Sequence, residues 1–330
     1  MGRRSKRRAS TIGAGALPTP EEAAKKTLLT QLKSVAKEEV LTGIATCGAD
    51  LSLLHAHGLP AVVAKWLASD EADVVGAATG VLTAYVAPAP QPAEDTTVPQ
   101  EGAGDKPAPA TGPTAAAAAL SFASELKASH KGKWVEVLRA RMAKPLSEEL
   151  RAPTMAFVRA FIVALCTSPD KQRARFARDL ASSALFVGGL ATSIAHHELV
   201  NERGGWEDST SLDALGALRT LLVPSDAAVG STSAPASART PRSPSAGKPT
   251  ATYALATLSA SEEACAHLTD FASRSPFGWG CDVERELLDG VRDLLCTLAS
   301  TPAGARSLGI GGLAALVAAV RDDECAAPDA

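Results

Sequence analysis

The sequence predicts an all-α protein, and three observations lead to this prediction. Apolar residues make up 46% of the chain and aromatic residues only 4%. Alanine dominates the apolar set, and alanine is the strongest helix former and a poor strand residue. Several long segments repeat their apolar residues at three- and four-residue steps, which is the period of a helix with one buried face. No segment alternates apolar and polar residues between turn-forming pairs, as half-buried strands do.

The clearest helix is expected over residues 282–300, which read DVERELLDGVRDLLCTLAS. Its apolar residues fall on one face of a helix and its charged residues on the opposite face. The segments 71–86, 153–166 and 212–222 show the same kind of pattern. The apolar face of 282–300 consists of Val283, Leu287, Leu288, Val291, Leu294, Leu295 and Leu298.

Segments of a different composition separate the helical regions. Residues 87–115 are rich in Pro, Ala and Gly, and residues 224–250 are rich in Ser, Pro and Thr. Neither segment buries enough apolar surface to offset the chain entropy lost on folding, so both are expected to be disordered linkers. Residues 1–20 are expected to form a disordered basic arm, because basic residues cluster near its start and it contains no acidic residue.

These boundaries leave helical regions at 21–86, 116–223 and 251–330. The formal charge of the chain is −3, which favours neither nucleic acid nor an acidic membrane as a partner of the whole protein. The last region is acidic, with twelve acidic residues against five arginines after residue 250. No run of about eighteen apolar residues occurs, so no membrane-spanning helix is expected.

The six cysteines form no C-x-x-C motif. Most of them lie among apolar residues of expected helices, so we expect free cysteines buried as small apolar side chains. This usage predicts a reducing compartment and therefore a place inside the cell. The cytoplasm is expected, and the basic arm would also suit nuclear targeting.

Three stretches of the chain are related to one another. Each contains a Gly-Leu pair that is expected to form a tight corner and to introduce an apolar helix of about three turns. These pairs are Gly58-Leu59, Gly189-Leu190 and Gly312-Leu313. The pattern resembles armadillo repeats over about 260–320, 38–86 and 148–200.

The resemblance implies an armadillo- or HEAT-like solenoid, in which each helical unit buries its apolar face against its neighbours. In armadillo proteins that carry peptides, a Trp and an Asn four residues later line a groove on the long helix. Neither residue is present at the corresponding positions of this chain, so no groove residue carries over. The pairs found there are Gly80 with Ala84, Ala160 with Ala164, and Asp293 with Thr297.

Motifs for catalysis and cofactor binding are absent or incomplete. The sequence G-x-G-x-x-A at Gly309, Gly311 and Ala314 lacks the preceding strand that a dinucleotide site needs. The stretch HELVN begins at His197, so Asn201 stands where a zinc-binding HExxH helix needs its second histidine. We therefore expect no enzyme, no catalytic, cofactor-binding or metal-binding residue, and no cofactor.

Five residues are candidates for contact with a partner. Trp206 and Trp279 lie in loop-like contexts, where an exposed Trp would anchor an interface. The alternative is that each Trp folds back over the helices. Lys171, Arg175 and Arg178 share one helical face, which would bind phosphates or an acidic partner. The alternative for this stripe is an ordinary solvated helix face.

Three residues are candidate phosphorylation sites. Ser10 follows Arg7 and Arg8, as sites of basic-directed kinases do, and Thr240 and Ser243 each precede a proline. A phosphate on Ser10 would subtract about 1.5–2 charges from the basic arm and weaken its electrostatic contacts.

The expected function is that of a non-enzymatic adaptor or scaffold for proteins, alone or as a subunit of a larger assembly. Two alternatives stay open. Residues 51–82 also resemble the armadillo core of nucleotide-exchange factors that bind the ATPase domain of Hsp70 chaperones, which implies a cochaperone. The basic arm and the stripe at 171–178 would instead suit a nucleic-acid-associated protein, whose affinity falls steeply with salt.

Overall fold

The chain is seen in a computed structural model that describes residues 19–87, 113–142, 148–166, 170–195, 210–222, 250–273 and 282–326. Within these residues every regular element is a helix and none is a strand, which confirms the predicted all-α class. Nearly all of the basic arm and of the two predicted linkers lies outside the described residues. The helices begin and end close to the predicted linker boundaries, with Ala115 opening one helix and Thr250 another.

The elements follow one another along the chain with short connections inside each group. They are α1 (Pro20–Gln31), α2 (Lys37–Ala49), α3 (Leu51–Ala56), α4 (Pro60–Val63), the 3-10 helix η1 (Ala64–Ala68), α5 (Ala72–Val86), α6 (Ala115–His130), α7 (Trp134–Met142), α8 (Glu148–Cys166), α9 (Lys171–Ala181), α10 (Ala184–Ala195), α12 (Thr210–Leu222), α13 (Thr250–Ser259), α14 (Glu262–Ala272), α15 (Asp282–Ala299) and α16 (Pro302–Ala326).

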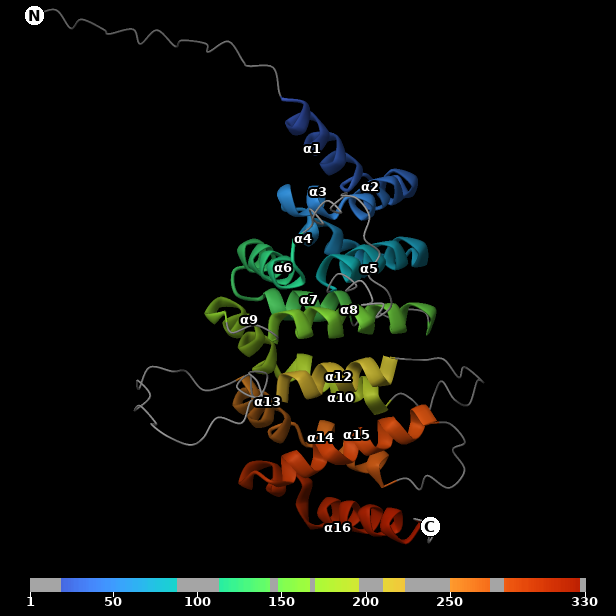
Figure 1. Cartoon of the computed structure of the whole chain (residues 1–330), viewed down its shortest axis with the longest axis vertical. Helices are drawn as coiled ribbons and strands as arrows, with labels where there is room; N and C mark the ends of the chain where they lie inside the picture. Colours follow the sequence, from blue (N-terminus) through green and yellow to red (C-terminus); the bar gives the residue numbers. More distant parts are fainter. Residues whose placement is uncertain are drawn as a thin grey trace, which may run out of the picture.

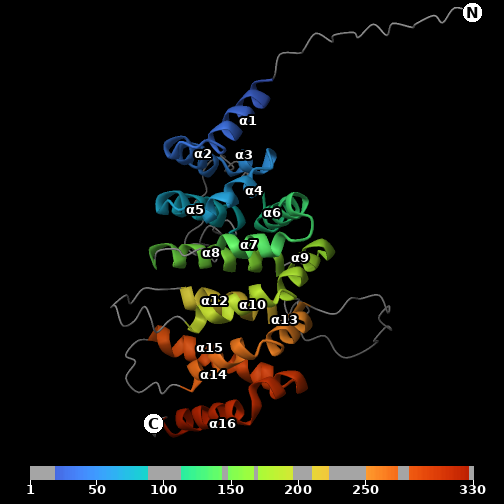
Figure 2. The same ribbon diagram turned by 180° about the vertical axis from the view of Figure 1, so that it is seen from behind.

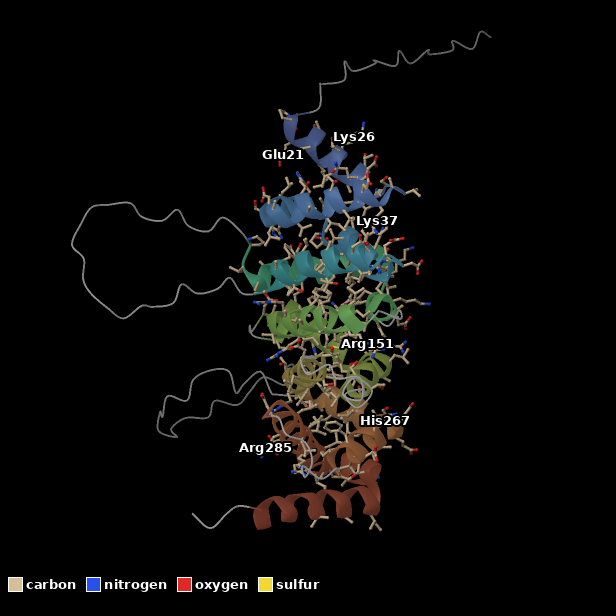
Figure 3. The ribbon with its side chains drawn as sticks, turned by 90° about the vertical axis from the view of Figure 1, so that its right-hand side faces the viewer. Glu21, Lys26, Lys37, Arg151, His267 and Arg285 are labelled. Atoms are coloured by element: carbon tan, nitrogen blue, oxygen red, sulfur yellow. The ribbon has the colours of Figure 1, made fainter. Side chains whose placement is uncertain are left out.

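The helices are stacked in chain order along the longest axis of the molecule, with α1 at one end and α16 at the other (Figure 1). The view from behind shows the same order (Figure 2). In the side view, side chains fill the space between successive layers of the stack (Figure 3). Neighbours in space are therefore mostly neighbours in the sequence, apart from the contacts that join one layer to the next.

The contacts between layers follow a regular order. The long helices α2, α5, α8, α12 and α15 contact one another in succession. A second succession joins η1, α7, α10, α14 and α16, and a third joins α6, α9, α13 and α16. From α6 onward, each group of three consecutive helices thus places one helix in each succession.

A single cluster of buried apolar side chains runs through these layers, from Leu28 near the start to Leu316 near the end. The few aromatic residues concentrate at the middle of the stack. The Phe122 ring of α6 meets the Phe157 and Phe161 rings of α8 edge-on, with centroids 5.8 and 5.2 Å apart. Edge-to-face pairs of this kind add about 0.5–1.5 kcal/mol beyond the burial of apolar area. These rings therefore hold the middle layers together.

The glycine corners were predicted correctly in one place and wrongly in two. Gly58 has φ +62° and stands between α3 and α4, as predicted. Gly189 lies inside α10, and the turn before that helix contains Ser183, whose hydroxyl oxygen accepts a hydrogen bond from the Phe186 amide. A side chain that satisfies the helix start makes a glycine corner unnecessary there.

Gly312 also lies inside a helix, and the corner of α16 is at Gly309, where φ is 63° and ψ is 178°. This backbone conformation is essentially restricted to glycine. A Cβ on Gly312 would lie 3.2 Å from Cγ2 of Thr269 on α14. Gly312 therefore serves the close approach of α16 to α14, and its prediction as a corner was wrong.

The cysteines follow the prediction except at one position. Cys47 and Cys265 are buried and Cys166 is half-buried, but Cys296 is exposed on α15. Burial raises the pKa of the Cys47 thiol to about 11 and that of Cys166 to about 12. Cys296 differs because its turn of α15 faces away from the buried Leu294 and Leu295. In the described part of the chain, no helix is both long and apolar enough to cross a bilayer.

Candidate interaction face

The exposed sides of the long helices form one continuous surface along the stack. The helices α5, α8, α12 and α15 contact one another in succession, and each presents a narrow outward face. Most side chains on this surface are small, and arginines and aspartates lie between them. We call this surface the long-helix face and define it by Gly80, Ala84, Ala156, Arg159, Gly216, Arg219, Asp293 and Cys296.

Ion pairs join the layers at this face. Nη1 of Arg159 on α8 lies 2.8 Å from Oδ1 of Asp213 on α12. Nη2 of Arg219 on α12 lies 3.3 Å from Oδ2 of Asp293 on α15. In both cases an arginine of one long helix reaches a carboxylate of the next, so the arginines hold successive helices in register.

A related pair joins the first two long helices. Nζ of Lys37 on α2 lies 2.7 Å from Oδ2 of Asp73 on α5 and 3.0 Å from Oε2 of Glu71. The hydrogen bond with Lys37 lowers the pKa of Asp73, and the same contact raises the pKa of Lys37. These side chains are about half exposed, so the pair orients the helices more than it stabilises them.

The pairs differ in burial, and this difference decides their energetic weight. The Asp213 side chain is only 11% exposed, whereas the Asp293 side chain is 72% exposed. A carboxylate that is largely removed from water needs its partner, because an unpaired buried charge is costly. The Arg159–Asp213 pair is therefore the stabilising one, and the Arg219–Asp293 pair contributes little.

Glycines make room for these arginines. A Cβ on Gly216 would lie 2.9 Å from Nε of Arg159, closer than real Cβ contacts come. A Cβ on Gly290 would lie 3.5 Å from Nη1 of Arg219 and would overlap Leu215. By contrast, a Cβ on Gly80 would meet no atom within 4 Å. The guanidinium groups can lie across the neighbouring helix only because those positions carry no side chain.

The predicted basic stripe lies elsewhere, on α9. Lys171 and Arg175 are exposed there, as a binding stripe requires. Arg178 is half-buried, and its Nε donates a hydrogen bond to the Ala174 carbonyl of its own helix at 3.2 Å. The stripe is thus reduced to two outward cations. The other candidates, Trp206, Trp279, Ser10, Thr240 and Ser243, lie outside the described residues.

The long-helix face was missed in the sequence because its partners are far apart in the chain. Arg159 and Asp213 are separated by 54 residues, and Arg219 and Asp293 by 74. One signal was present in the sequence. Gly216 and Gly290 interrupt two strongly patterned helices, and a glycine inside a helix costs up to about 1 kcal/mol unless packing requires it.

The face carries no recognisable catalytic arrangement. Among residues whose placement is described, no group of three or more His, Cys, Asp or Glu side chains could hold a metal ion. The arginine–carboxylate pairs bridge helices and enclose no cavity. No known protein family matches the chain, and no curated protein sequence does either.

Proposed function

We propose that this chain is a non-enzymatic scaffold of the armadillo-like solenoid type, which binds a protein partner along the long-helix face. The observation that carries the proposal is the succession of contacts among α2, α5, α8, α12 and α15, with the other helices in two further successions. Solenoids are built in this way, with each unit touching only its neighbours, and they use an extended face for binding.

The repeated order of helices supports the same interpretation. The groups α6–α7–α8, α9–α10–α12 and α13–α14–α15 each contribute one helix to each succession. A three-helix unit with its longest helix last is the arrangement that the sequence resemblance to armadillo repeats implies. The weak sequence similarity between units is then the consequence of linkers and of corners built without glycine.

The size of the face suits a protein partner. The 19 residues of α8 span about 28 Å at about 1.5 Å per residue. Packed helices lie about 8–10 Å apart, so the face from α5 to α15 extends over about 30 Å in the other direction. The resulting surface of roughly 600–800 Å² is close to the roughly 800 Å² that one partner contributes to a standard interface.

The small residues of the face favour this use. Gly80, Ala84 and Ala156 let the backbone of a partner approach closely, and the paired arginines add hydrogen-bond donors beside them. The side chains lose little conformational entropy on binding, because Gly and Ala have none to lose and the Arg159 guanidinium is already fixed on Asp213.

The test is affinity purification of the tagged full-length chain from its own cells, washed at low and at high salt and followed by mass spectrometry. The face variant carries A84R and C296R, which place bulky charge on exposed positions without unpairing a buried carboxylate. The control variant carries A256R and A266R, at exposed positions of α13 and α14. We expect a stoichiometric partner with the wild type and the control, and its loss with the face variant. Loss with the control alone, or equal retention by all three proteins, contradicts the proposal.

A further inference from the structure

A cluster of cations lies at the turn between α6 and α7, away from the long-helix face. The helix α6 ends at His130, the chain turns through Lys131 at φ 44° and Gly132 at φ 89°, and α7 begins at Trp134. The contact of η1 with α7 brings Lys65 to the same place. We call this cluster the basic corner and define it by Lys65, His130, Lys131, Lys133 and Arg141.

Arg141 is the inner member of the basic corner. Its Nη2 lies 3.2 Å from Nε2 of His130, whereas its Nη1 is buried and has no hydrogen-bond partner within the described ranges. Burial lowers the pKa of Arg141, yet a guanidinium stays protonated in proteins. A buried N–H group without an acceptor is costly. The geometry therefore leaves a donor that a bound acceptor would satisfy.

His130 adds a donor site of the same kind. Burial lowers its pKa, and the neighbouring charges of Arg141 and Lys65 lower it further, so the ring is neutral near neutral pH. Since arginine only donates, Nε2 of His130 must accept from Arg141, and the proton of the ring is on Nδ1. A neutral ring beside an arginine supplies no countercharge.

No carboxylate balances the basic corner. None of the ion pairs found between described residues includes one of its five members. Asp179 of α9 approaches the end of α6, but its Oδ2 already accepts from Nζ of Lys127 at 3.2 Å and from Nε1 of Trp134 at 3.3 Å. The exposed cations Lys65, Lys131 and Lys133 thus surround a buried arginine that faces no negative group.

We propose that the basic corner binds the phosphate group of a phosphorylated segment of a partner protein. A phosphate monoester carries about two negative charges and three acceptor oxygens. It would accept from both Nη atoms of Arg141, which suits the planar guanidinium, while the lysines supply point charges around it. This contact extends the proposed scaffold function to a second surface on different helices.

The compactness of the corner favours a phosphorylated protein segment over nucleic acid. Nucleic acids are bound by extended tracks of cations, with exposed aromatic rings on which bases stack. Here the cations gather at one turn. Trp134 beneath them is buried, and Nε1 of the half-buried Trp66 already donates to the Leu32 carbonyl at 3.0 Å.

The test uses the full-length chain and a fluorescent pool of short peptides with phosphothreonine at the centre and mixed residues on both sides. The same pool with unphosphorylated threonine and a single-stranded RNA oligonucleotide serve as comparison probes. We expect the phosphorylated pool to bind at least about tenfold more tightly than the unphosphorylated pool, as charge-assisted contacts of this kind require.

Two charge-reversal variants locate the site. K131E/K133E changes exposed side chains of the corner and leaves the core intact, so we expect it to bind the phosphorylated pool no better than the unphosphorylated one. K171E/R175E makes the same change of charge on exposed positions of α9, and we expect it to bind like the wild type. R141K keeps the charge but removes the two-pronged contact, so we expect weaker binding of the phosphorylated pool.

Several results would overturn the proposal. They are equal binding of both peptide pools, equal loss with the corner and α9 variants, and stronger binding of RNA that depends on Lys131 and Lys133. Each of these outcomes leaves the long-helix face untouched, because A84R/C296R tests that face separately.

Discussion

Arg159 of α8 lies across Gly216 of α12. Its Nη1 is 2.8 Å from Oδ1 of Asp213, and a Cβ on Gly216 would be 2.9 Å from its Nε. An arginine, a buried carboxylate and a helical glycine thus form one packing unit between two long helices. Several consequences of this unit and of its neighbours can be measured.

G80A and G216A are expected to differ in their effect on stability. Alanine is better than glycine inside a helix by up to about 1 kcal/mol. G80A meets no atom within 4 Å, so it should stabilise the protein by about 0.5–1 kcal/mol. G216A displaces the Arg159 guanidinium from Asp213, so it should give no stabilisation. Thermal denaturation followed by circular dichroism distinguishes the two, and a stabilising G216A would contradict the packing unit.

R159M and R219M are expected to rank in the order of burial of their partners. R159M leaves Asp213, with its side chain 11% exposed, without a countercharge. Because Arg159 itself is half exposed, we expect a loss of about 1–2 kcal/mol, below the range for fully buried pairs. R219M leaves an exposed Asp293 and should cost less than about 0.5 kcal/mol. Equal shifts in the thermal midpoint would refute this assignment.

Glu125 is expected to make stability depend on pH. Its Oε2 accepts from the Ala61 amide at 3.2 Å and its Oε1 from the Ser121 hydroxyl at 2.9 Å. Burial raises its pKa more than these hydrogen bonds lower it. A folded pKa above the unfolded one favours the protonated form on folding, so this contribution is full at low pH and is lost as pH rises through the folded pKa.

E125Q removes this titration and keeps an acceptor for Ala61. The thermal midpoint of E125Q minus that of the wild type should therefore increase between about pH 4 and pH 7. A difference that stays constant with pH, or that decreases as the pH is raised, would show that Glu125 does not titrate in this way.

The corner of α16 is expected to tolerate no side chain at Gly309. Its φ of 63° and ψ of 178° fall in a region that only glycine occupies, so G309A should cost about 1–3 kcal/mol in local stability. G311A is the matched control, since a Cβ there meets no atom within 4 Å. Amide hydrogen exchange over 302–318 should be faster in G309A and unchanged in G311A. Equal protection in both variants would contradict the role of Gly309.

The fold could be predicted from the sequence where local pattern decides structure. The apolar face expected for 282–300 is buried at the described positions from Leu287 to Leu298, because the period of a helix is a local property. The corners were harder. A serine can cap a helix start as well as a glycine can turn the chain, so Gly189 and Gly312 misled and Gly309 was read only as part of a rejected cofactor motif.

The candidate sites depend on contacts that no local pattern encodes. Arg159 meets Asp213 only through the packing of α8 on α12, and Lys65 joins Arg141 only through the packing of η1 on α7. The sequence prediction chose Lys171, Arg175 and Arg178 because they share one helix. It overlooked the basic corner because its members come from two helices, a turn and a distant 3-10 helix.

The central claim, that the long-helix face binds a protein partner, is tested most directly by photo-crosslinking from single cysteines of the full-length chain. Cys296 is the native attachment point in a variant that carries C281S and C325S, with A84C as a second point on the face and A266C as the control on α14. The account predicts crosslinks to one and the same partner from Cys296 and from A84C, and none from A266C. Crosslinks from A266C alone, or of equal yield from all three positions, would contradict it.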